Sequence, residues 1–298
     1  MSLRDFALLL GVCLVWAASN VVSKVLIATF AAPPLFYAAA RFAVVSLVML
    51  PWLWPPPARI WRLAVVGLLM GGGNFALLFI GLKTATPSAS VIVGQIGVPL
   101  TTLLSMIFLG EQVHWRRGVG MTLTLVGAVL VMWDPKGSFA FSTGLLFVAA
   151  SAFTGSVGAV MMKHMEGVRP MQFQAWVAVS SLLPMALLSL LFEQGQGAVL
   201  ATALWPFIGG VLFTALVVSV FAHTTYYGLI QRHDAGLLQP LTLMTPLFTI
   251  ALGVLITHDR FDARMALGAA VTLLGVLIIA VRPNRAMPLL LLIRNRAQ

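Results

Sequence analysis

The sequence predicts an all-α integral membrane protein with ten transmembrane helices, arranged as two inverted repeats of five helices. Of its 298 residues, 60% are hydrophobic and 9% are charged, whereas a soluble protein has roughly 25% charged residues. The mean hydropathy is +1.00, so much of the apolar surface must face lipid. Prolines and charges divide the chain into apolar stretches, and the two halves of the chain resemble each other. These observations together predict the fold class.

Ten apolar stretches are long enough to cross a membrane as helices, which takes about 20 residues. They cover residues 5–29, 34–54, 60–82, 87–109, 115–133, 143–163, 171–192, 205–230, 236–257 and 264–282. Prolines stand at predicted helix ends, as in Pro33-Pro34 and Pro55-Pro56-Pro57, because proline breaks a helical hydrogen-bond ladder. Only a few residues join the third and fourth stretches, so these two are expected to pack as an antiparallel hairpin.

Basic residues are distributed unevenly over the two sides of the predicted bundle. Ten crossings place both termini on one side of the membrane. Of the 18 Lys and Arg residues, six lie on the opposite side, namely Lys24, Arg41, Lys83, Lys136, Arg260 and Arg264. The other twelve mark the cytoplasmic face, because Lys and Arg concentrate in cytoplasmic loops. We therefore expect both termini to be cytoplasmic. The charges are scattered rather than gathered in a stripe, which argues against nucleic-acid binding.

An internal repeat relates the two halves of the chain. An offset of 147 residues superimposes Pro99 on Pro246, Gly81-Leu82 on Gly228-Leu229 and Arg117 on Arg264. We predict a first repeat over residues 1–134, a second over 143–282 and a cytoplasmic tail over 283–298. Each repeat has five helices, so the second copy enters the membrane from the opposite side. Inverted repeats suit transport by alternating access, in which the two halves exchange shapes.

Both halves of the chain contain short distinctive motifs. In the first half they are Trp16-Ala-Ala-Ser19-Asn20-Val-Val-Ser23-Lys24, Arg41-Phe42, Gly81-Leu-Lys-Thr-Ala-Thr-Pro-Ser88-Ala89-Ser90, Pro99 and Phe108-Leu109-Gly110-Glu111. With these motifs, nearly the whole chain resembles the ten-helix members of the drug/metabolite transporter superfamily, which have two EamA-type repeats. In the second half the matching positions are Gly228-Leu229, Gly236, Pro246 and Gly275. His258-Asp259 stands where that pattern expects a glutamate equivalent to Glu111.

Within that superfamily, the sequence is most similar to bacterial exporters of amino acids, particularly aromatic ones. The resemblance implies export of neutral or aromatic amino acids and related small metabolites through a central cavity, in the inner membrane of a bacterium. A multidrug or other metabolite exporter is the first alternative, and a channel is a remote one. No enzyme activity, cofactor or metal site is expected, and Cys13 is the single cysteine. One chain contains both repeats, so a monomer could work alone.

Polar side chains inside the predicted helices are the candidates for substrate contact, because they are costly in lipid and usually face a cavity or another helix. Trp16, Asn20 and Lys24 recur every four residues and share one face of the first helix. Lys24 either anchors this helix at the outer surface or attracts a substrate carboxylate. Arg41, at a similar depth in the second helix, has the same two interpretations.

The middle of the bundle supplies further candidates. Asn74 either contacts the cavity or forms a hydrogen bond at a close helix crossing. Gln95 is expected to contact the cavity where Pro99 bends the fourth helix, and Pro246 is the equivalent proline of the ninth helix. Because proline bends a helix, two bends at equal depth could act as hinges, and static kinks are the alternative interpretation.

The remaining candidates are aromatic or titratable. We expect Phe79 and Tyr227 either to wall a largely apolar pocket or to pack in the core. His223 could form a hydrogen bond with a ligand or take a proton, and Gln239 begins the ninth helix near the inner surface. A packing role is the alternative for His223. No Asp or Glu lies in the middle of a predicted span, which argues against a cationic substrate and against a carboxylate proton relay. We therefore expect facilitated movement down a gradient, with His223 as the mid-span titratable candidate.

Overall fold

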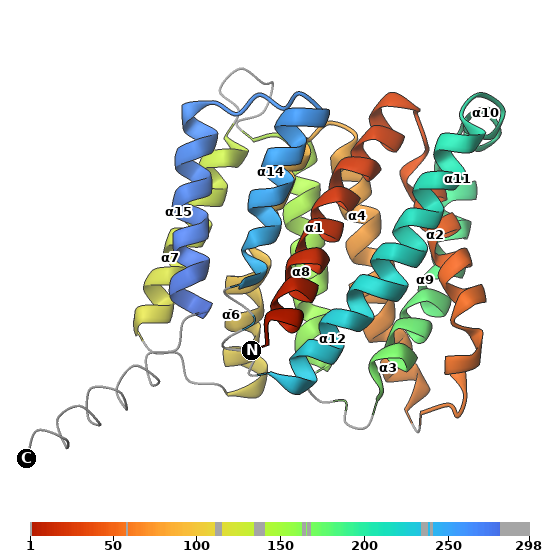
Figure 1. Ribbon diagram of the computed structural model, residues 1–298, viewed down its shortest axis with the longest axis horizontal. Helices are drawn as coiled ribbons and strands as arrows, with labels where there is room; N and C mark the ends of the chain where they lie inside the picture. The colour runs from red at the N-terminus through yellow and green to blue at the C-terminus, as the bar shows by residue number, and fades with distance from the viewer. Residues whose placement is uncertain are drawn as a thin grey trace, which may run out of the picture.

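The computed structural model describes residues 2–57, 59–110, 115–133, 141–162, 165, 168–233, 238 and 241–280. These residues form a helical bundle without strands (Figure 1), apart from one isolated bridge between Trp133 and Phe141. The helices are α1 (Leu3–Lys24), η1 (Val25–Thr29), α2 (Pro34–Val48), η2 (Leu50–Leu53), α3 (Ile60–Gly67), η3 (Leu68–Gly73), α4 (Asn74–Leu82), α5 (Pro87–Gly94), α6 (Gly97–Leu109), α7 (Trp115–Met132), α8 (Thr143–Met162), α9 (Pro170–Phe192), α10 (Gln196–Thr202), α11 (Leu204–Leu212), η4 (Phe213–Ala222), α12 (His223–Arg232), α14 (Met244–Ile256) and α15 (Ala263–Ala280).

Among the described residues, seven helical segments are long and apolar enough to cross a membrane. They are Leu3–Thr29, Ile60–Leu82, Pro87–Leu109, Thr143–Met162, Pro170–Phe192, Leu204–Tyr226 and Ala263–Ala280. The apolar helices α2 and α14 are shorter, and α7 begins with Trp115-Arg116-Arg117, which lowers its hydropathy. Large apolar side chains such as Leu190 and Leu255 point outward. An all-helical bundle with these properties is consistent with a membrane protein.

Two stretches that the sequence predicts as continuous helices contain a break. The span 87–109 is divided into α5, which ends at Gly94, and α6, which begins at Gly97. In the second half, a turn at Leu243 precedes α14. Pro99 and Pro246 are the third residues of α6 and α14. Proline is tolerated in the first turn of a helix, so these prolines begin a new helix rather than bend a continuous one.

The spans Ile60–Leu82 and Leu204–Tyr226, one in each half of the chain, each contain a π-helical segment. In the first half it is η3, and in the second half it is η4. The offset of 147 residues places η3 on residues 215–220, inside η4. Within η4, Ser219 Oγ donates to the carbonyl oxygen of Thr214 (3.1 Å). His223, the first residue of α12, forms a hydrogen bond between its Nδ1 and the carbonyl oxygen of Val218 in η4 (2.8 Å). These side chains therefore bond carbonyl groups five residues earlier. Such π-helical turns often occur at functional sites.

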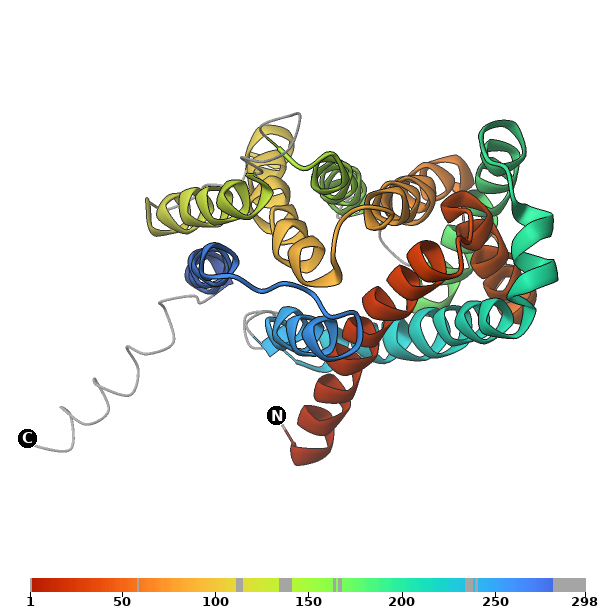
Figure 2. The same cartoon turned by 90° about the horizontal axis from the view of Figure 1, so that it is seen from above.

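The most extensive packing joins α7 to α15 and α2 to α9. From above, α7 and α15 stand together at one end of the bundle (Figure 2). Glycines let these two helices approach closely. A Cβ on Gly120 would lie 2.7 Å from the carbonyl oxygen of Gly275, and one on Gly127 would lie 2.6 Å from that of Gly268. At the other end, a core of buried side chains from α2, α4 and α9 holds the bundle together.

Candidate functional site

A cavity of about 540 Å³ lies between helices from both halves of the chain. Its wall consists of small, hydroxyl-bearing and apolar residues, with one basic residue: Asn74, Gly94, Gly97, Val98, Thr101, Thr102, Ser105, Arg117, Ala152, Gly155, Ser156, Tyr226, Thr242, Leu243, Val276, Ile279 and Ala280. The volume lies within the range of about 300–1,000 Å³ that is typical of small-molecule sites. None of these described lining residues is acidic, so the described part of the wall has a net positive charge.

The break between α5 and α6 forms one side of the cavity. Gly94 and Gly97 flank this break, and a Cβ on Gly94 would meet nothing within 4 Å. Across from it, Ser156 Oγ donates to the carbonyl oxygens of Gly97 (3.0 Å) and Ala152 (2.7 Å). Thr102 Oγ1 donates to the carbonyl oxygen of Val98 (3.0 Å). The protons of these two hydroxyl groups are therefore engaged with the backbone, and the lone pairs on their oxygens remain to accept hydrogen bonds.

Asn74 combines the two roles that the sequence suggested as alternatives. Its side chain lines the cavity, and its Nδ2 donates to the carbonyl oxygen of Ser151 on α8 at 2.8 Å. The helices cross closely here, because a Cβ on Gly155 would lie 2.6 Å from Asn74 Nδ2. This hydrogen bond fixes the orientation of the amide and leaves its oxygen as an acceptor.

Trp16 and His223, both predicted site residues, lie behind the cavity wall. The ring of Trp16 is 5.5 Å from that of His223 and 5.0 Å from that of Tyr226, measured between centroids. Tyr226 itself lines the cavity, so Trp16 is in contact with a residue of the wall. Asn20 is turned to its own helix, where its Nδ2 donates to the carbonyl oxygen of Trp16 (3.1 Å).

Two predicted site residues have structural contacts away from the cavity. Lys24 Nζ donates to the carbonyl oxygens of Leu82 (2.9 Å) and Lys83 (3.4 Å) at the end of α4, where a cation is favourable because the helix dipole is negative there. Phe79 is 1% exposed, and its ring lies 4.8 Å from that of Tyr37. Both contacts favour the structural interpretation of these residues.

Three other predicted positions are described only in part. Gln95 lies in the break between α5 and α6 and is partly buried. The backbone of Tyr227 belongs to α12, but its side chain lies outside the described part of the structure, as does the whole of Gln239.

Arg41 is a residue whose importance the sequence only suggested. It is 1% exposed, and its Nε and Nη2 donate to Ser219 Oγ at 3.1 and 2.9 Å. Its guanidinium carbon lies 4.1 Å from the centroid of the Phe75 ring, and Nη1 has no hydrogen-bond partner within the described residues. An arginine well inside an apolar helix was the available signal, but the sequence did not indicate that it would be fully buried.

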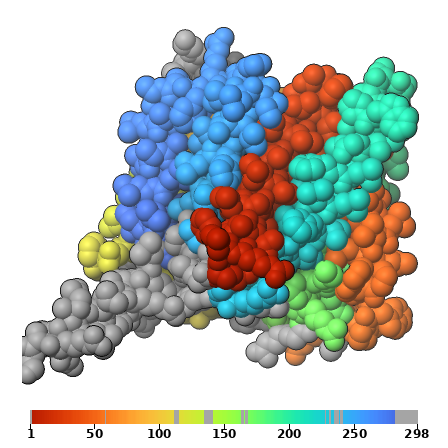
Figure 3. Space-filling model, in the orientation of Figure 1, coloured from red at the N-terminus to blue at the C-terminus, as the bar shows by residue number. Residues whose placement is uncertain are grey.

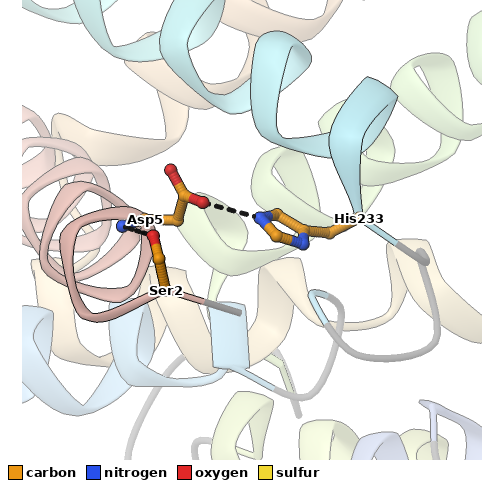
Figure 4. Close-up of polar contacts among 3 residues, drawn as sticks. All are labelled: Ser2, Asp5 and His233. Carbon is orange, nitrogen blue, oxygen red and sulfur yellow. Dashed lines mark hydrogen bonds and ion pairs between the residues drawn. The ribbon is translucent and has the colours of Figure 1, made fainter.

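A second cavity, of about 450 Å³, opens beside the beginning of α1. Arg4, Arg169 and Arg232 are among its lining residues. Next to it, His233 Nε2 lies 2.9 Å from Asp5 Oδ2 (Figure 4), and the start of α1 lies against α12 on the surface (Figure 3). In the described residues, no three His, Cys, Asp or Glu side chains are grouped to hold a metal ion.

The sequence model of the EamA-like transporter family matches residues 5–133 and 142–281. The chain belongs to this family. A protein of Escherichia coli (strain K12) named "Probable amino-acid metabolite efflux pump" is 25% identical over 93% of this chain and 95% of its own length. The protein of the same name from Salmonella typhimurium is 26% identical over the same shares, and Protein PecM of Dickeya dadantii is 24% identical over 94% of this chain and 92% of its own.

A crystal structure of another protein superimposes on this EamA-like chain with a TM-score of 0.62 and 22% identity, covering 100% of each chain. This likeness concerns the fold alone. The EamA-like family and the two relatives named as efflux pumps are transporters rather than enzymes, which confirms the prediction of a membrane transporter of the drug/metabolite superfamily.

Proposed function

We propose that this EamA-like transporter exports neutral or aromatic amino acids and related small metabolites by alternating access. The observation that carries the proposal is the 540 Å³ cavity, whose wall combines helices of both halves with neutral hydrogen-bonding groups. Such a wall suits a small polar solute. Two relatives are named amino-acid metabolite efflux pumps, which supports amino acids as the substrate class.

The proposal includes ten membrane crossings in two inverted repeats. The offset of 147 residues superimposes the break before α6 on the turn before α14, and η3 on part of η4. The two most extensive helix contacts each join equivalent helices of the two repeats. The helices α7 and α15 are the fifth of each repeat, and α2 and α9 are the second. A two-fold axis in the membrane plane would bring equivalent helices together in this way.

We further propose that the cavity faces the cytoplasm and that both termini lie there, in the inner membrane. Arg117 and Ala280, at the predicted cytoplasmic ends of α7 and α15, line the cavity. At the opposite ends, carboxylates hold helices together. Glu193 accepts hydrogen bonds from the N–H groups of Leu35 and Phe36 at 2.9 Å each. These contacts support a structure that is closed toward the outside.

Counterflow in liposomes tests the proposed function. Purified protein is reconstituted into vesicles loaded with one unlabelled amino acid at a time, and entry of labelled L-phenylalanine is followed without a pH gradient. Saturable exchange is expected. Failure of every amino acid, with the orientation of the protein verified and dye efflux intact, would favour a multidrug exporter. A flux that does not saturate would indicate a channel.

A further inference from the structure

Arg117 carries the only charge among the described residues that line the 540 Å³ cavity. It is the third residue of α7 and is partly buried. Within the described part of the chain it makes no hydrogen bond or ion pair, although a guanidinium group has five N–H donors. A positive charge without a partner in the wall of a cavity attracts an anionic group, and it does so more strongly than it would in bulk water because the local dielectric constant is lower.

The neighbouring polar groups complement this charge. The hydroxyl protons of Thr102 and Ser156 are engaged with backbone carbonyl oxygens, and the Nδ2 of Asn74 is engaged with Ser151. Their oxygens therefore present lone pairs to the cavity. The wall thus offers hydrogen-bond acceptors together with one cationic donor, a combination that fits a solute with both an ammonium group and a carboxylate.

We propose that Arg117 binds the carboxylate of the transported solute, while the oxygens of Thr102, Ser156 and Asn74 accept hydrogen bonds from its ammonium group. This inference rests on the proposed function and adds the chemical feature by which a substrate is selected. A solute with an amide in place of the carboxylate would leave the guanidinium group without its charged partner, so the transporter discriminates against it.

The usual role of an arginine at the cytoplasmic end of a membrane helix is to set the orientation of that helix. The chain contains an internal control for this role. Arg116 precedes Arg117 on the same helix and carries the same charge, but it is exposed and does not line the cavity. Replacement of either arginine removes the same contribution to orientation, and only replacement of Arg117 changes the charge of the cavity wall.

The first arm of the test is counterflow of L-phenylalanine and of L-phenylalaninamide by the wild type, Arg116→Gln, Arg117→Gln and Arg117→Lys. We expect Arg117→Gln to raise the KM for phenylalanine roughly ten- to hundredfold, the range for loss of a hydrogen bond to a charged group, and to reduce the preference over the amide. Arg116→Gln should match the wild type. Arg117→Lys should fall between them, since lysine keeps the charge but loses the fork of donors.

The second arm does not depend on amino acid transport. The thermal stability of the same purified variants is measured with 3-phenylpropionate and with its amide. The carboxylate should stabilise the wild type and Arg116→Gln, but not Arg117→Gln, and the amide should have little effect. If no amino acid exchanges but this pattern holds, the proposed function fails while the role of Arg117 stands. If Arg117→Gln and Arg116→Gln respond alike in this arm, the role of Arg117 is overturned, whatever the transport result.

Discussion

The carboxylate of Asp259, in the loop between α14 and α15, accepts two hydrogen bonds from Ser88 at the start of α5. The main-chain N–H donates at 2.9 Å and the hydroxyl group at 2.6 Å. A carboxylate is favourable at this place, because the first N–H groups of a helix lack partners and the helix dipole is positive there. Gly253 permits the approach, since a Cβ on it would lie 2.5 Å from Asp259 Oδ2 and from Ser88 Oγ. This contact joins the two halves of the chain.

We predict that Asp259→Asn destabilises the protein by about 1–3 kcal/mol, the cost expected when a hydrogen bond to a buried charged group is weakened. Thermal unfolding of the purified protein in detergent measures the change. A double-mutant cycle with Ser88→Ala assigns it to this contact, because coupled residues show a non-additive free energy. Strictly additive effects of the two substitutions would show that the bond between the Ser88 hydroxyl group and the Asp259 carboxylate contributes nothing measurable.

The two prolines that follow helix breaks provide the second prediction. Pro99→Ala and Pro246→Ala each restore a backbone N–H that can extend the helix backward across the break. A continuous helix resists bending, so counterflow should slow several-fold for either variant, while thermal stability stays within about 1 kcal/mol of the wild type. Pro184→Ala, inside the continuous helix α9, is the control and should affect transport less. Unchanged rates would reduce both prolines to packing features.

The third prediction concerns Gly155, which lies next to Asn74 in the wall of the cavity. In Gly155→Ala the new methyl group would lie 2.6 Å from Asn74 Nδ2, so the amide must shift and its hydrogen bond to Ser151 weakens. We expect kcat/KM for phenylalanine to fall about tenfold, the effect typical of a misplaced group of this size in a binding pocket. Gly94→Ala adds a methyl group to the same cavity without displacing any atom within 4 Å. An equal loss in both variants would contradict a specific role for Asn74.

Several helices could be predicted from the sequence almost to the residue. The apolar segments Ile60–Leu82 and Pro87–Leu109 have the predicted ends. The helices α8 and α9 begin within one residue of the starts predicted for them. This agreement has a physical origin. The length of an apolar stretch and the prolines and charges at its ends are properties of the sequence alone. The break inside 87–109 depends on packing against other helices, which the sequence does not show directly.

The binding site was less predictable, because burial and side-chain direction are set by the tertiary structure. Asn74 lines the cavity, and the glycines before it were the signal in the sequence that suggested this position. Arg117 was interpreted only through the orientation of its helix, since the sequence gave no indication that α7 turns it toward a cavity. The position equivalent to Glu111 holds His258, which has a left-handed backbone conformation (φ 53°), and Asp259 follows it. Glu111 itself lies outside the described residues.

The fourth prediction separates function from stability at Arg41. Arg41→Met replaces the buried guanidinium with an apolar side chain and leaves Ser219 bonded to the carbonyl oxygen of Thr214. Such replacements are often neutral or stabilising, so we expect the stability to fall by less than about 1 kcal/mol. Ser219→Ala removes the acceptor of two bonds while the buried charge remains, and it should destabilise by about 1–3 kcal/mol. Thermal unfolding of both variants measures these changes.

Counterflow by Arg41→Met then shows whether the charge is needed for transport. A folded variant with a strongly reduced rate indicates that the charge is retained for function, which is the expected result for an ionisable group inside a membrane. The opposite outcome, a large loss of stability in Arg41→Met with transport unchanged in the molecules that remain folded, would make Arg41 a structural residue.

The last prediction concerns Arg264, the residue that the offset of 147 pairs with Arg117. Arg264 donates to the carbonyl oxygen of Trp133, next to the last residue of α7. The residue equivalent to Trp133 is Ala280, which ends α15 and lines the cavity with Arg117. If the two halves exchange shapes during transport, then Arg264 faces the cavity in the outward-open state, and Arg117 contacts the end of α15 as Arg264 now contacts the end of α7.

In vesicles with one orientation, Arg117→Gln should raise the KM for solute on the cytoplasmic side, and Arg264→Gln should raise it for solute on the outer side. Both substitutions acting on the same side would rule out this exchange of roles, because an inverted pair must present its arginines to opposite faces.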